Sequence, residues 1–162
     1  MQNTPNLNLP YPEPTDPPDG AAQIKGLAEA IDGLAEPKLF VFSANTEKPV
    51  GANWQTAYQT TWDMPGPGFL LVIGEVELED TGQVPGDCQT RLNLDGFDGP
   101  ISVTGVTAGA QAVTFTVPVI SHVSLSAAKT VQVIVQTGST GSQNAGNVRN
   151  ANLRGLYLPR YA

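Results

Sequence analysis

The residues that could act as nucleophiles, bases or metal ligands are few. His122 is the single histidine and Cys88 the single cysteine among 162 residues. A Ser-His-Asp arrangement or a His/Cys metal cluster needs more such side chains than this chain has. We expect Cys88 to be a small buried side chain without a disulfide partner. We expect His122, in an alternating stretch, to lie on a surface or in an interface without a catalytic role.

The carboxylates offer only weak alternatives. A pair of acids could act as acid and base in the cluster formed by Glu75, Glu77, Glu79 and Asp80. We expect them instead to be solvated charges at the end of a strand. Asp95 and Asp98 flank a glycine-rich turn and could offer oxygens to Ca²⁺, but Asp-Gly turns are common. The glycine- and serine-rich run 138–142 lacks the lysine and helix of a phosphate loop. We predict no enzymatic activity, no cofactor and no metal.

The charge distribution excludes further classes of function. Residues 1–36 carry six acids against Lys25 alone, and only four scattered bases follow Asp98. Nucleic-acid binding needs clustered Lys and Arg, so we expect no nucleic-acid partner. The longest apolar run, 69–73, is far shorter than the ~20 residues of a membrane span, so we expect no membrane insertion. No apolar leader is visible, and we expect the protein to stay in the host cytoplasm until assembly or lysis.

Residues 1–19 are expected to form an extended arm. They hold six of the fourteen prolines, which fix φ and remove backbone donors. The arm should be polyproline-like and make no strand pairing of its own. A disordered tail is the alternative. Apolar side chains are unusual in a solvated tail, and we expect these residues to anchor the arm on a neighbouring subunit or particle: Leu7, Leu9, Tyr11, Pro12 and Pro14.

Residues 20–36 are predicted to form one short helix. Four apolar residues at spacings of three, four and three make one stripe: Ile24, Leu27, Ile31 and Leu34. About fifteen residues containing two glycines are marginal as an isolated helix, so the helix must be packed. Two heptads cannot hold an oligomer together unaided. We therefore expect a collar, in which the stripe meets copies of itself brought together by the following domain.

Residues 37–162 form the predicted β domain. From Lys38 the apolar period changes to two, and about eight strands follow at regular spacing. The strongest is 69–78, and Pro118 in the stretch 113–125 implies an edge strand or a bulge. The fold class is therefore mainly β, an antiparallel sandwich of jelly-roll type, preceded by the arm and the helix.

Three aromatic residues give an alternative binding function. Trp54, Tyr58 and Trp62 alternate with threonines at even spacing, which predicts one face of a strand. They could be stacking platforms for a glycan or a host receptor. Core or subunit-interface positions are the competing interpretation.

Two parts of the sequence resemble known families. The proline-rich segment 9–17 and the helix segment 23–32 resemble the start of minor tail and other structural proteins of actinobacteriophages. The segments 67–76, 117–135 and 151–158 are similar to the trimeric jelly rolls of the C1q/tumour-necrosis-factor type found in phage virions. The resemblance implies a homotrimer built into a particle through its N-terminal arm. It assigns no calcium ligand in this chain.

The sequence thus predicts a non-enzymatic structural protein of a phage virion. A homotrimer would bury the apolar flank that a monomer leaves exposed. The first prediction is a minor tail, tail-tip or fibre-like subunit involved in host attachment. A capsid decoration protein or head fibre is the first alternative, and a glycan- or receptor-binding knob is the second. Its partners would be itself, other tail or capsid proteins, and in the last case a host surface receptor.

Overall fold

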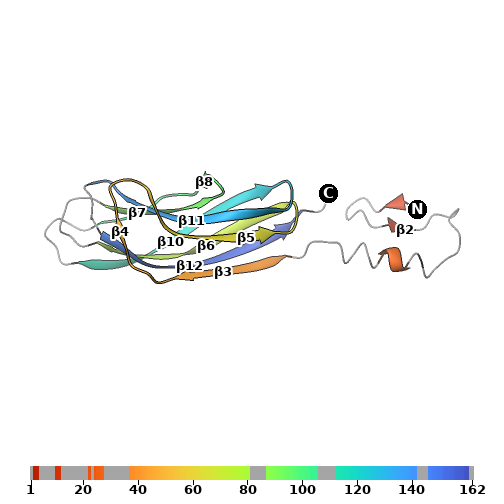
Figure 1. The fold of residues 1–162 in the computed structure, drawn as a ribbon, viewed down its shortest axis with the longest axis horizontal. Helices are drawn as coiled ribbons and strands as arrows, with labels where there is room; N and C mark the ends of the chain where they lie inside the picture. Colours follow the sequence, from red (N-terminus) through yellow and green to blue (C-terminus); the bar gives the residue numbers. More distant parts are fainter. Residues whose placement is uncertain are drawn as a thin grey trace.

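The computed structural model describes residues 2–3, 10–11, 22, 24–27, 37–80, 87–105, 112–141 and 146–160. The described β domain is a sandwich of two antiparallel sheets (Figure 1). The predicted fold class, a mainly β antiparallel sandwich, is confirmed.

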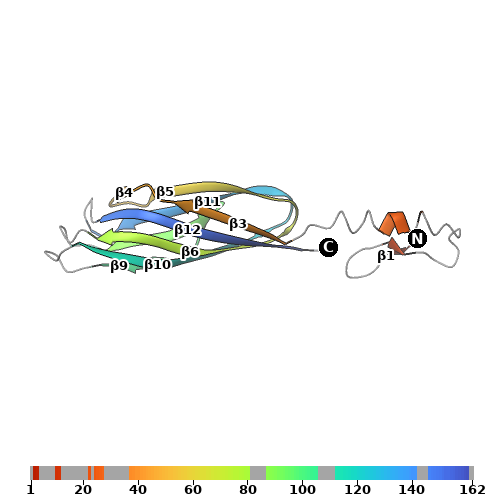
Figure 2. The ribbon, with the colours of Figure 1, turned by 90° about the horizontal axis from the view of Figure 1, so that it is seen from below.

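The first sheet has the strand order β10-β6-β12-β3, and β4 pairs with the first residues of β12. Figure 2 shows these four strands side by side in this order. Its strands are β3 (Lys38–Ala44), β4 (Lys48–Val50), β6 (Gly68–Asp80), β10 (Val113–Leu125) and β12 (Gly146–Pro159). We call it the β12 sheet.

The second sheet has the order β5-β11-β7-β8, with β9 also paired to β7. Its strands are β5 (Gln55–Met64), β7 (Cys88–Leu94), β8 (Phe97–Asp98), β9 (Ser102–Thr104) and β11 (Lys129–Ser139). We call it the β11 sheet. The first and last long strands pair in one sheet while the second pairs with the penultimate strand in the other, which is the connectivity of a jelly roll.

The core lies between the sheets and is filled by alternating side chains. Trp62 of β5 stacks on Phe40 of β3, with ring centroids 5.1 Å apart. It also lies on Gly155 of β12, where an added Cβ would come within 2.9 Å of Trp62 Cε3. The wide indole ring therefore joins the two sheets at a position where only glycine fits. In the same core, the hydroxyl of Tyr58 donates a hydrogen bond to the Thr46 carbonyl at 2.6 Å.

A bulge in β5 corrects one sequence expectation. The pairing between β5 and β11 shifts register between Val135 and Gln136, and Ala57 has no partner in it. Ala57 and Tyr58 are consequently both buried although they are adjacent. The extra residue reverses the alternation toward the start of the strand. Trp54 therefore does not share a face with Tyr58 and Trp62, and the prediction of one aromatic face was wrong.

The arm makes a short ladder that the sequence did not predict. β1 (Gln2–Asn3) pairs with β2 (Pro10–Tyr11) in antiparallel register. The expectation that the arm makes no strand pairing was wrong over these four residues. Pro10 lacks an amide donor, but its carbonyl can still accept, and proline is tolerated where one edge is open. Residues 24–27 are helical, within the predicted helix 20–36.

Two strands of the β12 sheet, β10 and β12, add detail to the predicted β domain. β10 is an edge strand and Pro118 lies opposite Glu75 in unbroken register, so the edge interpretation of that proline is confirmed. β12 begins at Gly146, and residues 146–148 pair with both β4 and β6.

Candidate assembly surface

The outer face of the β12 sheet is built from rows of side chains that the register brings together. Val41, Arg154, Ile73 and Ile120 are successive cross-strand partners and form one row. The next row consists of Leu39, Leu156, Leu71 and His122. A third begins with Leu158 and Phe69. Four strands that are distant in sequence therefore contribute to one surface.

Half of this surface is apolar and open to solvent. Leu39 is 80% exposed and Val41 68%, while Ile73 and Ile120 are each 47% exposed. We call the following residues the assembly face: Leu39, Val41, Phe69, Leu71, Ile73, Ile120, Leu156 and Leu158. It occupies the end of the sheet where β3 begins and β12 ends (Figures 1 and 2). Fully burying one such side chain is worth about 1.5–3 kcal/mol, so the face favours a covering partner.

The other half of the same face is polar, and two of its acids have partners within the chain. Glu79 accepts hydrogen bonds from Arg149 Nη2 at 2.7 Å and from Arg149 Nε at 3.2 Å. This pairing lowers the pKa of the Glu79 carboxyl and raises the pKa of Arg149. Asn150 donates to Glu77 at 2.5 Å. These acids therefore serve as cross-strand partners, and the structure does not bring them together as an acid-base pair facing a cleft.

A hollow marks the border between the two halves. It has a volume of about 750 Å³, and its walls include Ile73, Ile120 and Pro118 on the apolar side. Glu75, Asn152 and Arg154 line it as well. Ser102 of β9 closes one side, where its hydroxyl donates to the Pro118 carbonyl at 2.5 Å. The hollow offers space, apolar walls and one charge of each sign.

His122 lies beside the assembly face, in the row that contains Leu71. It is exposed, and its ring lies 5.3 Å from that of Phe69, between centroids. Its register partner is Leu71. The predicted surface position is what the structure shows, and the interface role remains a proposal.

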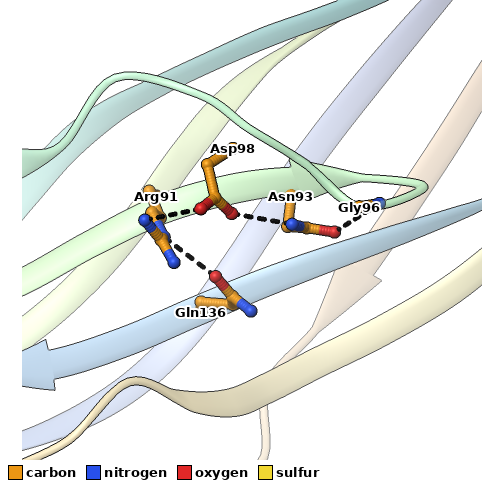
Figure 3. A network of polar contacts seen from close by, with 5 residues as sticks. All are labelled: Arg91, Asn93, Gly96, Asp98 and Gln136. Atoms are coloured by element: carbon orange, nitrogen blue, oxygen red, sulfur yellow. Dashed lines mark hydrogen bonds and ion pairs between the residues drawn. The ribbon is translucent and has the colours of Figure 1, made fainter.

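A second polar cluster occupies the outer face of the β11 sheet (Figure 3). Arg91 forms an ion pair with Asp98 at 2.8 Å and donates to Gln136 at 2.9 Å. Asn93 donates to Asp98 at 2.7 Å and accepts from the Gly96 amide at 3.0 Å. The cluster ties the β7-β8 hairpin to β11. Asp98 is therefore a hairpin partner of Arg91.

The three aromatic residues do not form a stacking platform together. Tyr58 and Trp62 are 5% and 6% exposed and belong to the core. Burial, with the nearby Glu47 and Glu77, raises the pKa of Tyr58. Trp54 is half-buried, and the guanidinium of Arg91 lies over its ring, 4.3 Å from the centroid. The glycan-contact assignment was wrong for Tyr58 and Trp62, because a bound sugar could not reach rings that fill the sandwich.

The predicted anchor and collar residues are only partly described. Leu7, Leu9, Pro12, Pro14, Ile31 and Leu34 lie outside the described residues. Tyr11 belongs to β2. Ile24 and Leu27 are 71% and 38% exposed, so their apolar side chains are open to another chain. The anchoring and collar roles stay predictions.

The remaining candidate groups show no reactive arrangement. Cys88 is fully buried, and burial, with the charges of Asp80 and Asp87, raises its pKa to about 12. Asp95 forms an ion pair with Lys129. Among the described residues, no three or more His, Cys, Asp or Glu side chains lie together as metal ligands. In the same part of the chain, no helix is long and apolar enough to cross a membrane.

Comparisons with known proteins return structures only. No family model and no curated protein sequence matches the chain. A chain in the structure of infectious bursal disease virus, Gx strain, is 14% identical with a TM-score of 0.47, over 75% of this chain and 32% of that one. The VP2 subviral particle of the same virus gives 11% and 0.43, over 76% and 33%. This chain thus spans about a third of the viral chains it matches.

One match is a complete small domain. A family 35 carbohydrate binding module from Clostridium thermocellum is 13% identical with a TM-score of 0.33, over 74% of this chain and 98% of that one. Similarities at these identities and scores carry no inference about function.

Proposed function

We propose that this chain is a non-enzymatic structural protein of a phage virion that assembles as a homotrimer. The observation that carries the proposal is the assembly face, in which four strands place eight large apolar side chains on one open surface. The sequence resemblance to trimeric phage jelly rolls supports the same reading. A three-fold arrangement would bury this face on every copy.

The face lies at the end of the sandwich where β3 begins. β3 begins at Lys38, next to Tyr157 of β12, so residues 20–36 of three copies would start close together. Ile24 and Leu27 would then meet their counterparts as a collar. Residues 1–19 would attach the trimer to the particle, in a tail or fibre position, or on the capsid as a decoration protein or head fibre.

The oligomeric state tests the first part. Light scattering on the full chain at micromolar concentration should give three times the 17.0 kDa of one chain. A mass of one chain would refute the trimer.

Deletion of residues 1–19 tests the second part. The shortened protein should remain a trimer but no longer join particles. Normal incorporation would show that the arm is not the anchor. Imaging a particle that carries the full chain separates the tail position from the capsid position.

A further inference from the structure

Two charged side chains stand in the hollow at the border of the assembly face. Arg154 of β12 and Glu75 of β6 both line it. Within the described residues, neither makes a hydrogen bond or an ion pair through its side chain. The acids further along β6, Glu77 and Glu79, both have partners in the chain. Arg154 and Glu75 are therefore available to a partner that covers the hollow.

Covering this face requires that both charges be matched. Arg154 lies between Val41 and Ile73 in its row. A purely apolar partner would therefore remove its guanidinium from water without giving it an opposite charge. Removing an unpaired charge from water is strongly unfavourable. A partner that fits this surface must bring apolar side chains, one carboxylate and one base.

We propose that Arg154 of one copy pairs with Glu75 of the neighbouring copy across the interface between assembly faces. This inference rests on the proposed function, since it requires that copies meet on this surface. A second copy supplies a carboxylate for Arg154, a guanidinium for Glu75 and the matching apolar surface. Residues 1–36, with six acids and one lysine, could match Arg154 but would add like charge beside Glu75.

Such a pair would determine how two copies align at the interface more than how tightly they bind. A charge pair that is desolvated in an interface disfavours wrong alignments, because every other alignment leaves like or unpaired charges buried. The apolar rows alone are similar to each other and would tolerate sliding. Arg154 and Glu75 would fix one alignment.

Charge reversal in the full chain tests the proposal. Arg154→Glu and Glu75→Arg should each raise the concentration for half-assembly at least about tenfold, measured by light scattering over a dilution series. In an equimolar mixture of the two variants, a mixed trimer regains opposite charges at two of its three contacts, so assembly should be recovered in part. The double variant regains opposite charges at all three contacts and should recover assembly fully. Circular dichroism confirms that each variant is folded.

A matched control changes the same amount of charge elsewhere. Gln59 and Gln132 are exposed on the opposite sheet. Changing both to Glu, or both to Lys, should leave assembly unaltered.

The outcomes separate this inference from the proposed function. If the unmodified chain is a monomer, the trimer and the pair both fail. If it is an oligomer and both single variants assemble like it, only the pair is overturned. If the double variant recovers assembly but the mixture assembles no better than either single variant, Arg154 and Glu75 pair within one chain, which also overturns the proposal.

Discussion

Trp62 of β5 lies on Gly155 of β12, and the two residues fit only because one has no side chain. The indole ring also stacks on Phe40, with an interplanar angle of 16°. An added Cβ at Gly155 would overlap the ring, with Cε3 and Cη2 each at 2.9 Å. The contact joins the two sheets through residues 93 positions apart in sequence. The core is therefore sensitive to any added side-chain volume at Gly155.

Gly155→Val should therefore destabilise the domain. Overpacking a filled core typically costs about 1–3 kcal/mol, and we expect a loss of this size in urea unfolding. Adding Trp62→Phe should recover part of it, because the smaller ring leaves space. Gly51→Ala is the control, since the three atoms nearest its added Cβ all belong to the side chain of Gln55, which can move. Equal losses in both single variants would contradict this account.

The assembly face, rather than the helix, should determine the oligomer. Leu39→Ser with Val41→Ser should convert the full chain to a monomer in light scattering, because it removes the two most exposed apolar side chains of the face. Each is exposed in the single chain, so the fold should be affected by less than about 0.5 kcal/mol. Ile24→Ser with Leu27→Ser should leave the trimer intact. The reverse pattern would place the assembly determinant in the helix.

Arg91 should contribute more to stability than an ordinary surface arginine. It contacts Asp98, Gln136 and the Trp54 ring, and its side chain is 18% exposed. Arg91→Ala should lower the free energy of unfolding by about 1–3 kcal/mol and alter tryptophan fluorescence. Arg160→Ala, at an exposed residue directly after β12, is the matched control and should have little effect. A similar effect of both variants would show that the cluster adds nothing.

Cys88 should be inert in the folded protein. Burial raises its pKa to about 12, so the thiolate that reacts with alkylating reagents is scarce at pH 8. Iodoacetamide should modify the thiol only after denaturant is added. Modification of the native protein at the rate of a free cysteine would contradict the buried placement.

The Glu79–Arg149 pair should make stability depend on pH in the acid range. The pKa of Glu79 is lower in the folded protein, so its contribution is present above the unfolded value and is lost as the pH falls through the folded value. Arg149→Gln should therefore be less stable than the unmodified chain at pH 7. The difference should disappear on acidification below the folded pKa of Glu79. A difference that persists there would assign it to packing of the arginine.

Much of the fold follows from the alternation of apolar residues along the chain. The inward positions Val131, Val133 and Val135 are buried as the pattern predicts. Leu153, Gly155 and Tyr157 are also buried. Alternation is a property of one strand, so it identifies the core side of each strand without knowledge of its neighbours.

Only the tertiary structure decided what the outward residues do. An extra residue at Ala57 moved Trp54 away from Tyr58 and Trp62, and a bulge depends on pairing with β11. Val41, Arg154 and Ile73 are far apart in sequence and became one row through register alone. The sequence determined which face of each strand points inward, because burial acts on each strand separately. The assembly face, with Arg154 and Glu75 at its border, exists only because strands from across the chain pair side by side.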